Sequence, residues 1–224
     1  KNPKKILIII QRSNGDVFLS LTLINALYNN LHSPQIDLLV NDDTLAVARL
    51  LPNINFIHTF SYKKKHEGRL RQEKKLVKSI FRQYELSINL TASDRSVIYA
   101  LLASNKSISA IEKETQKSWW KKILLTNHYY FDVTKHILLN NLKSLKFLNI
   151  EQAPIQNSAN ISDEVMDTVR KKLTILGISD FIIFHPSAQY KYKIYPQHLR
   201  DELLSLLSKL GASIIVTGTN NQID

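Results

Sequence analysis

Apolar runs and helical repeats alternate along the first part of the chain. The run 6–11 is rich in β-branched residues and has the length of a buried parallel strand. The segment 16–30 has apolar residues three to four positions apart, which predicts a helix. Further strands are expected at 36–40, 55–60, 86–90 and 107–110, and helices are expected to begin near 42, 74, 93 and 136. This order predicts an α/β fold with a doubly wound parallel sheet.

Two stretches interrupt the alternation. Residues 112–130 are polar and lack periodicity, which predicts an irregular connection. Residues 151–160 are polar, contain Pro154 and form a candidate linker. Beyond the linker the pattern restarts, with helices expected at 162–176 and 197–210, each closed by a glycine, and strands expected at 181–184 and 213–217.

The restart of the pattern predicts two domains. Residues 1–155 are expected to form one Rossmann-like domain, and residues 156–224 the start of a second domain that is truncated in this chain. The chain begins with Lys1 rather than Met, and the second α/β unit stops after its second strand. We therefore expect the sequence to be a fragment.

Composition and charge narrow the function classes. The chain has no cysteine, which excludes disulfides, thiolate nucleophiles and cysteine-ligated zinc, and its 5 glycines argue against a glycine-rich nucleotide loop. The 30 Lys and Arg residues against 19 Asp and Glu give a net charge of +11. This charge predicts an anionic partner: nucleic acid, a phosphorylated sugar or an acidic membrane surface. No apolar run approaches the roughly 20 residues of a membrane span and no signal peptide is recognisable, so we expect a cytoplasmic protein.

A polar turn, 12–16, follows the first expected strand and opens a helix. Ligands of doubly wound sheets bind at the carboxyl ends of the strands. A carboxylate placed there, such as Asp16, can act as a general base on a hydroxyl. Asp16 can equally serve as the N-cap or first-turn acid of the helix, and its position alone leaves both roles open.

Three other segments have the composition of binding sites. The loop 185–196 carries Ser187, Ala188 and Lys193, which can hold a diphosphate through backbone N–H groups, a hydroxyl and a point charge. The basic stretch 62–71 can grip acceptor phosphates, and the cluster 119–122, Trp-Trp-Lys-Lys, can lie on lipid headgroups or grip an anionic glycolipid. Each segment also has an alternative without a binding role. The loop 185–196 can be a solvated loop, 62–71 a solvated charged face, and a Trp of 119–122 can pack in the core. No His or carboxylate spacing is typical of a metal site.

Taken together, these segments resemble glycosyltransferase family 9, the ADP-heptose:lipopolysaccharide heptosyltransferases. The matching segments occur in family order and are 5–9 with 14–17, 35–40, 84–91, 135–137, 185–188, 193–196 and 214–218. The Ile-Asn-Leu-Thr run at 88–91 and the Trp-Lys-Lys segment are most similar to the branch that adds the third core heptose.

The resemblance implies a GT-B enzyme, with two Rossmann-like domains facing a cleft. The N-terminal domain would bind the lipopolysaccharide inner core as acceptor and the C-terminal domain ADP-heptose as donor substrate, with inversion and without a metal or other cofactor. The resemblance implies peripheral contact with the anionic inner face of the inner membrane and no nucleic-acid partner. It implies that Asp16 is the general base. The residues implied for the donor and its phosphates are Ser187, Ala188, Lys193, Gly15, Thr217 and Gly218. Those implied for the acceptor are Arg12, Asn14, Lys63, Lys64, Arg69 and Arg95.

One family motif does not occur in the chain. The nucleotide pocket of the family is lined by a later segment similar to Asp-Ser-Gly-Pro-Met-His, and nothing of this kind appears before Asp224. We therefore expect the 224-residue chain to be inactive alone. Three alternatives stay open: a GT-B glycosyltransferase that uses another nucleotide sugar, a non-catalytic basic module that binds nucleic acid, and a non-catalytic scaffold on the same fold.

Overall fold

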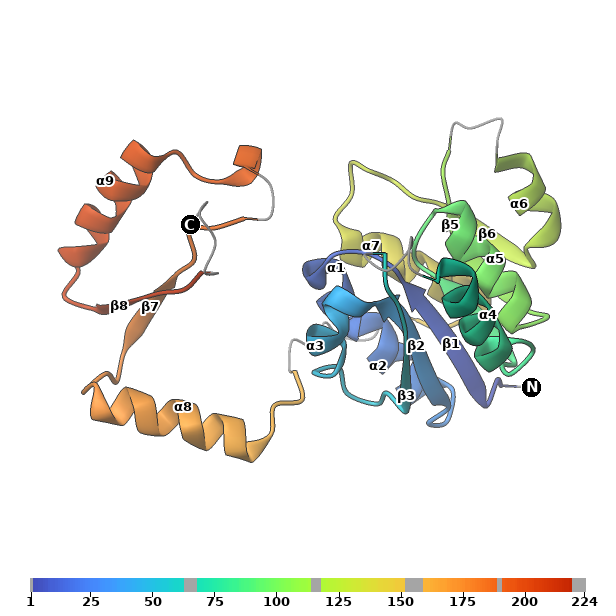
Figure 1. Cartoon of the computed structure of the whole chain (residues 1–224), viewed down its shortest axis with the longest axis horizontal. Coiled ribbons are helices and arrows are strands. Elements are labelled where there is room, and N and C mark those ends of the chain that lie inside the picture. Colours follow the sequence, from blue (N-terminus) through green and yellow to red (C-terminus); the bar gives the residue numbers. More distant parts are fainter. Residues whose placement is uncertain (1, 63–67, 114–117, 152–158, 189–190, 219–224) are drawn as a thin grey trace. The chain divides into compact units, whose positions relative to one another are not determined.

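The computed structural model describes residues 2–62, 68–113, 118–151, 159–188 and 191–218 (Figure 1). The chain divides into two compact units, Lys1–Asn160 and Ile161–Asp224, which are described separately below. The domain boundary expected between residues 155 and 156 lies outside the described residues.

Six parallel strands form the sheet of the first unit. The strands are β1 (Lys5–Ile10), β2 (Gln35–Asn41), β3 (Phe56–Phe60), β4 (Leu86–Asn89), β5 (Ser107–Ile111) and β6 (Asn127–Tyr130). Their order across the sheet is β3-β2-β1-β4-β5-β6. The chain therefore first winds outwards from β1 to β3 and then returns to the other side of β1, which is the doubly wound arrangement expected from the sequence.

Helices cover both faces of this sheet (Figure 1). They are α1 (Asn14–Phe18), α2 (Leu21–Asn30), α3 (Leu45–Ala48) after the 3₁₀ helix η1 (Asp42–Thr44), α4 (Arg69–Ile80), α5 (Asp94–Ala103), α6 (Trp119–Leu124) and α7 (Ile137–Leu142), which the 3₁₀ helix η4 (Lys143–Leu148) follows. The side chains of β1 alternate between the two cores: Ile6, Ile8 and Ile10 pack with α1, α2 and α7, whereas Leu7 and Ile9 pack with α4 and α5. All five side chains are buried. Truncating one of them to Ala would cost about 2–5 kcal/mol of unfolding free energy.

The expectation of an irregular connection at 112–130 is wrong. The described part of this segment contains the helix α6 and the strand β6, which pairs in parallel with β5. Asn127 and His128 give β6 a polar start that an edge strand tolerates, because one side of an edge strand has no neighbouring strand. The helix expected at 16–30 is also two helices, α1 and α2, separated at Leu19 and Ser20.

The described part of the second unit contains two α-helices and two strands. They are α8 (Asp163–Ile175), β7 (Phe181–Phe184), α9 (Gln197–Ser208) and β8 (Ser213–Val216), with the short 3₁₀ helix η5 (Lys191–Lys193) before α9. β7 and β8 pair in parallel. Gly177, with a φ of 65°, closes α8 as expected, because Gly177 N donates to Thr174 O and Ile178 N to Leu173 O. No described residue of this unit is buried as a whole, although single atoms such as Ser187 Oγ are.

A buried polar network fixes β2, β3 and the segment before β4 to one another. The Tyr84 hydroxyl donates to Asp37 Oδ2 over 2.8 Å, and the amide of Asn55 donates to Asp37 Oδ1 over 2.9 Å. His58 Nε2 lies 2.8 Å from the Tyr84 hydroxyl. Since the hydroxyl proton goes to Asp37, Nε2 of His58 carries the proton of the bond to Tyr84. Burial lowers the pKa of His58 from its usual value of 6.5, while the charge of Asp37 acts in the opposite direction.

We predict that an NMR titration of His58 in the folded protein has its midpoint below 6.5. The folded state then binds this proton more weakly than the unfolded state does. The free energy of unfolding therefore decreases as the pH falls from 6.5 towards the folded pKa of His58. Asp37→Asn is expected to lower the midpoint further, because it removes the negative charge that favours the imidazolium. The urea-unfolded chain provides the reference, and a folded midpoint at or above that reference would contradict the prediction.

Candidate active site

The turn between β1 and α1 holds Asp16 at the carboxyl edge of the sheet. Ser13, and not Asp16, is the N-cap residue of α1, and Asp16 is the third residue of that helix. The Ser13 hydroxyl donates to Asp16 Oδ2 over 3.0 Å, and Arg12 Nε lies 3.3 Å from the same oxygen. The side chain of Asp16 is 25% exposed. Two neighbours thus orient the carboxylate, which stays open to solvent at the edge where doubly wound sheets bind ligands.

Arg12 is itself held by a distant segment. Its guanidinium lies over the ring of Phe131, 4.6 Å from the ring centroid. Phe131 follows β6 directly and packs against the larger core of the unit. The aromatic face stabilises the cation and limits its rotamers, so the charge beside Asp16 is fixed in place before any ligand arrives.

Several buried polar groups at this edge lack hydrogen-bond partners among the described residues. They are both side-chain atoms of the Gln11 amide, Asn41 Oδ1, Ser61 Oγ and Arg95 Nη1. Gln11 follows β1, Asn41 ends β2 and Ser61 follows β3, and the register pairs Ile10 with Val40 and Asn41 with Phe60. Each unsatisfied buried group costs about 1–3 kcal/mol. Their collection at one edge indicates that this edge is built for a polar ligand.

Sequence reasoning missed Gln11, Asn41 and Ser61. Their signal in the sequence is weak, since each is an ordinary polar residue at the end of an apolar run. Thr91 appeared in the sequence analysis only as the end of the segment 84–91, and its own contact was missed. Its hydroxyl accepts a hydrogen bond from Gln11 N over 3.0 Å. Asn89 fixes the segment after β4, because its amide donates to Thr91 O and to the hydroxyls of Ser96 and Ser109.

The residues assigned to the acceptor lie in different surroundings. Asn14 is exposed at the start of α1, beside Gly15. Arg95, the second residue of α5, places its guanidinium over the rings of Phe60 and Tyr62, and its Nε lies 3.5 Å from Glu73 Oε1. Arg69 begins α4. The expected contacts of Lys63 and Lys64 lie outside the described residues.

The residues assigned to the donor follow the two strands of the second unit. Ser187 and Ala188 come shortly after β7, and Thr217 and Gly218 come directly after β8. His185 Nδ1 lies 2.9 Å from the Thr217 hydroxyl, and Thr217 N donates to Phe184 O over 3.0 Å, so the two strand ends are joined. Ser187 Oγ is buried without a partner in the described part of the chain. Lys193 ends η5 with its Nζ 5.7 Å from the centroid of the Tyr192 ring.

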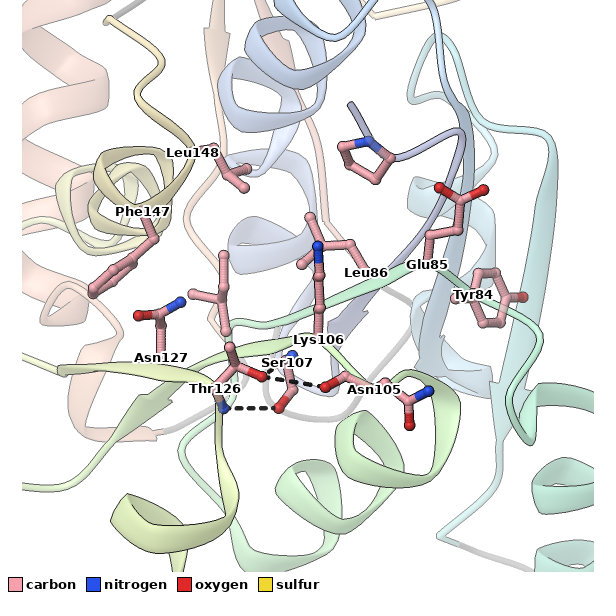
Figure 2. Close-up of a pocket in the computed structure, with 12 residues that line it drawn as sticks. Tyr84, Glu85, Leu86, Asn105, Lys106, Ser107, Thr126, Asn127, Phe147 and Leu148 are labelled. Carbon is pink, nitrogen blue, oxygen red and sulfur yellow. Dashed lines mark hydrogen bonds between the residues drawn. The ribbon is translucent and has the colours of Figure 1, made fainter. Parts of the chain in front are cut away.

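A cavity of about 650 Å³ lies at the opposite, amino-terminal edge of the first sheet (Figure 2). The residues that line it include Leu86, Ser107 and Asn127, which begin β4, β5 and β6. Figure 2 shows that the polar groups of Ser107 and Thr126 are paired with each other: Ser107 N donates to Thr126 Oγ1 and Thr126 N to Ser107 Oγ. Because these groups are satisfied and lie away from the turn of Asp16, this cavity is not the candidate active site.

The described ranges contain neither a cluster suited to a metal ion nor a helix suited to span a membrane. No group of three or more His, Asp or Glu side chains with the arrangement of a metal site occurs there. No helix in the same ranges has both the length and the apolar character needed to cross a bilayer.

Comparison with solved structures identifies the fold class. A glycosyltransferase family 9 protein from Veillonella parvula superposes with a TM-score of 0.78 at 16% identity, covering 97% of this chain and 63% of that one. The Escherichia coli heptosyltransferase WaaC, solved with ADP, gives a TM-score of 0.71 at 15% identity, covering 98% of this chain and 68% of that one. The chain therefore has a partial GT-B fold built from Rossmann-like α/β units, as expected from the sequence.

The profile of glycosyltransferase family 9 (heptosyltransferase) matches residues 73–224, and the chain belongs to this family. A lipopolysaccharide heptosyltransferase 3 from Escherichia coli strain K12 is 25% identical over 212 residues, which are 92% of this chain and 60% of that protein. A second Escherichia coli protein of the same description is 22% identical over 217 residues, 95% of this chain and 63% of that protein. The chain thus spans about three fifths of the length of these curated relatives. The turn of Asp16 precedes the residues that the family profile matches.

We predict that Gly15→Ala leaves the stability of the first unit unchanged or slightly raised. A Cβ at Gly15 would meet no atom within 4 Å, and the residue is helical rather than left-handed. Ala is favoured over Gly in a helix by up to about 1 kcal/mol. The control is Gly68→Ala, which should cost about 1–2 kcal/mol because Gly68 has a φ of 84°. Urea unfolding followed by circular dichroism measures both, and a clear loss of stability in Gly15→Ala would show a structural need for this glycine.

Proposed function

We propose that the protein is an inverting, metal-independent glycosyltransferase that moves heptose from ADP-heptose to the inner core of lipopolysaccharide. The observation that carries the proposal is the Asp16 carboxylate, held at the carboxyl edge by Ser13 and Arg12 in a chain of the heptosyltransferase family. Asp16 takes the proton of the acceptor hydroxyl as the hydroxyl oxygen attacks the anomeric carbon. The bond from that carbon to the diphosphate breaks, ADP leaves, and the configuration inverts.

The leaving diphosphate needs stabilisation that a metal supplies in other enzymes. In this proposal Ser187, Ala188 and Lys193 supply it through a hydroxyl, backbone N–H groups and a positive charge. Thr217 and Gly218 complete the edge on which these residues lie, and Gly15 leaves room for close approach of the donor.

The acceptor is an anionic glycolipid in this proposal, in keeping with the net charge of +11. In this proposal Arg12, Asn14, Arg69 and Arg95 contact the acceptor, together with Lys63 and Lys64. Arg12 and Arg95 suit this role because aromatic rings hold both guanidinium groups, so little rotamer freedom is lost on binding. The enzyme would work in the cytoplasm in peripheral contact with the anionic inner face of the membrane.

We predict that Asp16→Asn lowers acceptor-dependent ADP release by at least about 100-fold, because the variant keeps the shape of the side chain but cannot accept the proton. The assay uses the complete product of the gene, ADP-heptose, and a lipopolysaccharide truncated at the heptose. The control is Asp43→Asn, which removes an exposed carboxylate from the helical turn after the neighbouring strand β2 and should leave the rate unchanged.

The same assay decides between the proposal and its alternatives. Release that survives Asp16→Asn would reduce Asp16 to a first-turn acid of α1 while keeping the enzyme. Competition by UDP or GDP in place of ADP would point to another nucleotide sugar. An absence of release with every donor, together with tolerance of Asp16→Ala, would favour a scaffold, and salt-sensitive DNA or RNA binding would favour a nucleic-acid module. Turnover by the 224-residue chain alone would refute its expected inactivity.

A further inference from the structure

The helix α6 buries a lysine and exposes three apolar side chains, which is the reverse of the usual arrangement in a surface helix. Lys121 is only 1% exposed, whereas Trp119 is 64%, Ile123 71% and Leu124 58% exposed. Helices on protein surfaces ordinarily bury their apolar stripe and expose their charges. Lys is almost never fully buried unless it is paired, and clustered exposed apolar side chains indicate an interaction site.

Specific contacts hold α6 in this orientation. Lys121 Nζ lies 2.7 Å from Asp94 Oδ1 and donates to Ala92 O over 3.0 Å. Trp120 is half-buried and packs against a small core that includes Val97 and Ile111. These contacts hold the buried Lys121 inwards, although the Asp94 carboxylate is itself exposed, and the helical spacing then turns Trp119 and Ile123 outwards.

We propose that α6 anchors the protein in the interfacial region of an anionic bilayer. Trp119, Ile123 and Leu124 enter the headgroup and upper acyl region, and Lys122 remains at the level of the lipid phosphates. Trp and aliphatic residues beside Lys are the composition of interfacial helices, and Trp favours this depth because its ring is amphipathic. A helix of six residues is too short to cross the bilayer, so it lies in the interface.

Charge favours a lipid surface over an apolar protein partner. Lys122 is exposed beside the apolar residues of α6, with its Nζ 5.5 Å from the centroid of the Tyr130 ring. Lys113, on the connection before α6, is exposed as well. A chain with a net charge of +11 gains affinity for anionic lipids from each such residue near the membrane surface.

The position of α6 relates the anchor to the candidate active site. Lys121 binds Ala92 and Asp94, which lie on the segment that leaves the carboxyl end of β4. That edge also carries the turn of Asp16, next to β4 on the neighbouring strand β1. Bilayer contact through α6 therefore brings this edge close to a lipid-linked acceptor. This last step rests on the proposed function, whereas the lipid binding of α6 does not.

The test uses vesicles that contain neither donor nor acceptor, so its outcome is independent of glycosyl transfer. Wild type is expected to sediment with phosphatidylethanolamine–phosphatidylglycerol vesicles and to bind phosphatidylcholine vesicles more weakly. The double variant Ile123→Glu, Leu124→Glu should lose at least about tenfold in vesicle affinity, since it places two charges at the apolar interface. The control is Phe81→Glu, which charges a half-exposed aromatic residue at the other edge of the sheet, where the neighbouring Arg82 N donates to Leu102 O.

Tryptophan fluorescence provides a second readout, because the chain has two Trp residues with different surroundings. On vesicle addition the emission of wild type should shift to the blue and be quenched by brominated lipids. Trp119→Phe should abolish this response and Trp120→Phe should keep it. Circular dichroism confirms that each variant is folded. Vesicle binding of the Ile123→Glu, Leu124→Glu variant equal to that of wild type, or a blue shift that survives Trp119→Phe, would overturn the proposal.

Discussion

The burial of β1 on both faces is the constraint on which the first unit depends. Five of its six side chains are buried, and they alternate between two separate cores. Each fully buried aliphatic side chain contributes roughly 1.5–3 kcal/mol relative to exposure. A strand of this kind must lie inside a sheet with helices on both sides, and its parallel neighbours β2 and β4 carry the chain away in opposite directions. The turn 12–16 therefore emerges between two diverging connections, where a ligand can approach a carboxylate.

The two edges of the sheet differ in how their polar groups are satisfied. At the amino-terminal edge, Ser107 and Thr126 bond each other across neighbouring segments, although a large cavity lies beside them. At the carboxyl edge, Gln11, Asn41 and Arg95 keep buried atoms without partners among the described residues. Unsatisfied buried groups reduce stability, and proteins retain such costs mainly where function requires them. The candidate site is therefore argued from the accounting of hydrogen bonds and not from the size of a cavity.

The sequence predicted most of the sheet because the strands of the first unit are buried apolar runs. It also predicted the end of α8, since Gly177 adopts the left-handed conformation that a helix stop favours. It failed for α6, because periodicity assumes that Lys faces water and Trp faces the core, and an ion pair with Asp94 reverses this. The place of Asp16 after a strand end could be foreseen; of the two helical roles considered for it, the N-cap is taken by Ser13, and Asp16 is an acid of the first turn.

Other parts of the site could not be foreseen from the sequence. The support of Arg12 by Phe131 joins residues far apart in the chain, and no local pattern signals such a contact. The place of the Arg95 guanidinium over the rings of Phe60 and Tyr62 depends in the same way on the packing of α5 near the end of β3. Local pattern fixes where an element lies along the chain, whereas these contacts are set by tertiary packing.

The two units differ in how firmly their packing holds the candidate site residues. A catalytic group must be held within roughly 0.5 Å of its productive position by a supported scaffold. The turn of Asp16 has such support, because it rests on a core that includes Val17 and Ile10. Ser187 and Lys193 lie on a unit in which no described residue is buried as a whole, and Ile183 of β7 and Val216 of β8 are 62% and 60% exposed. Two strands and two helices with open apolar faces are marginal alone, so the donor residues become preorganised only when those faces are covered.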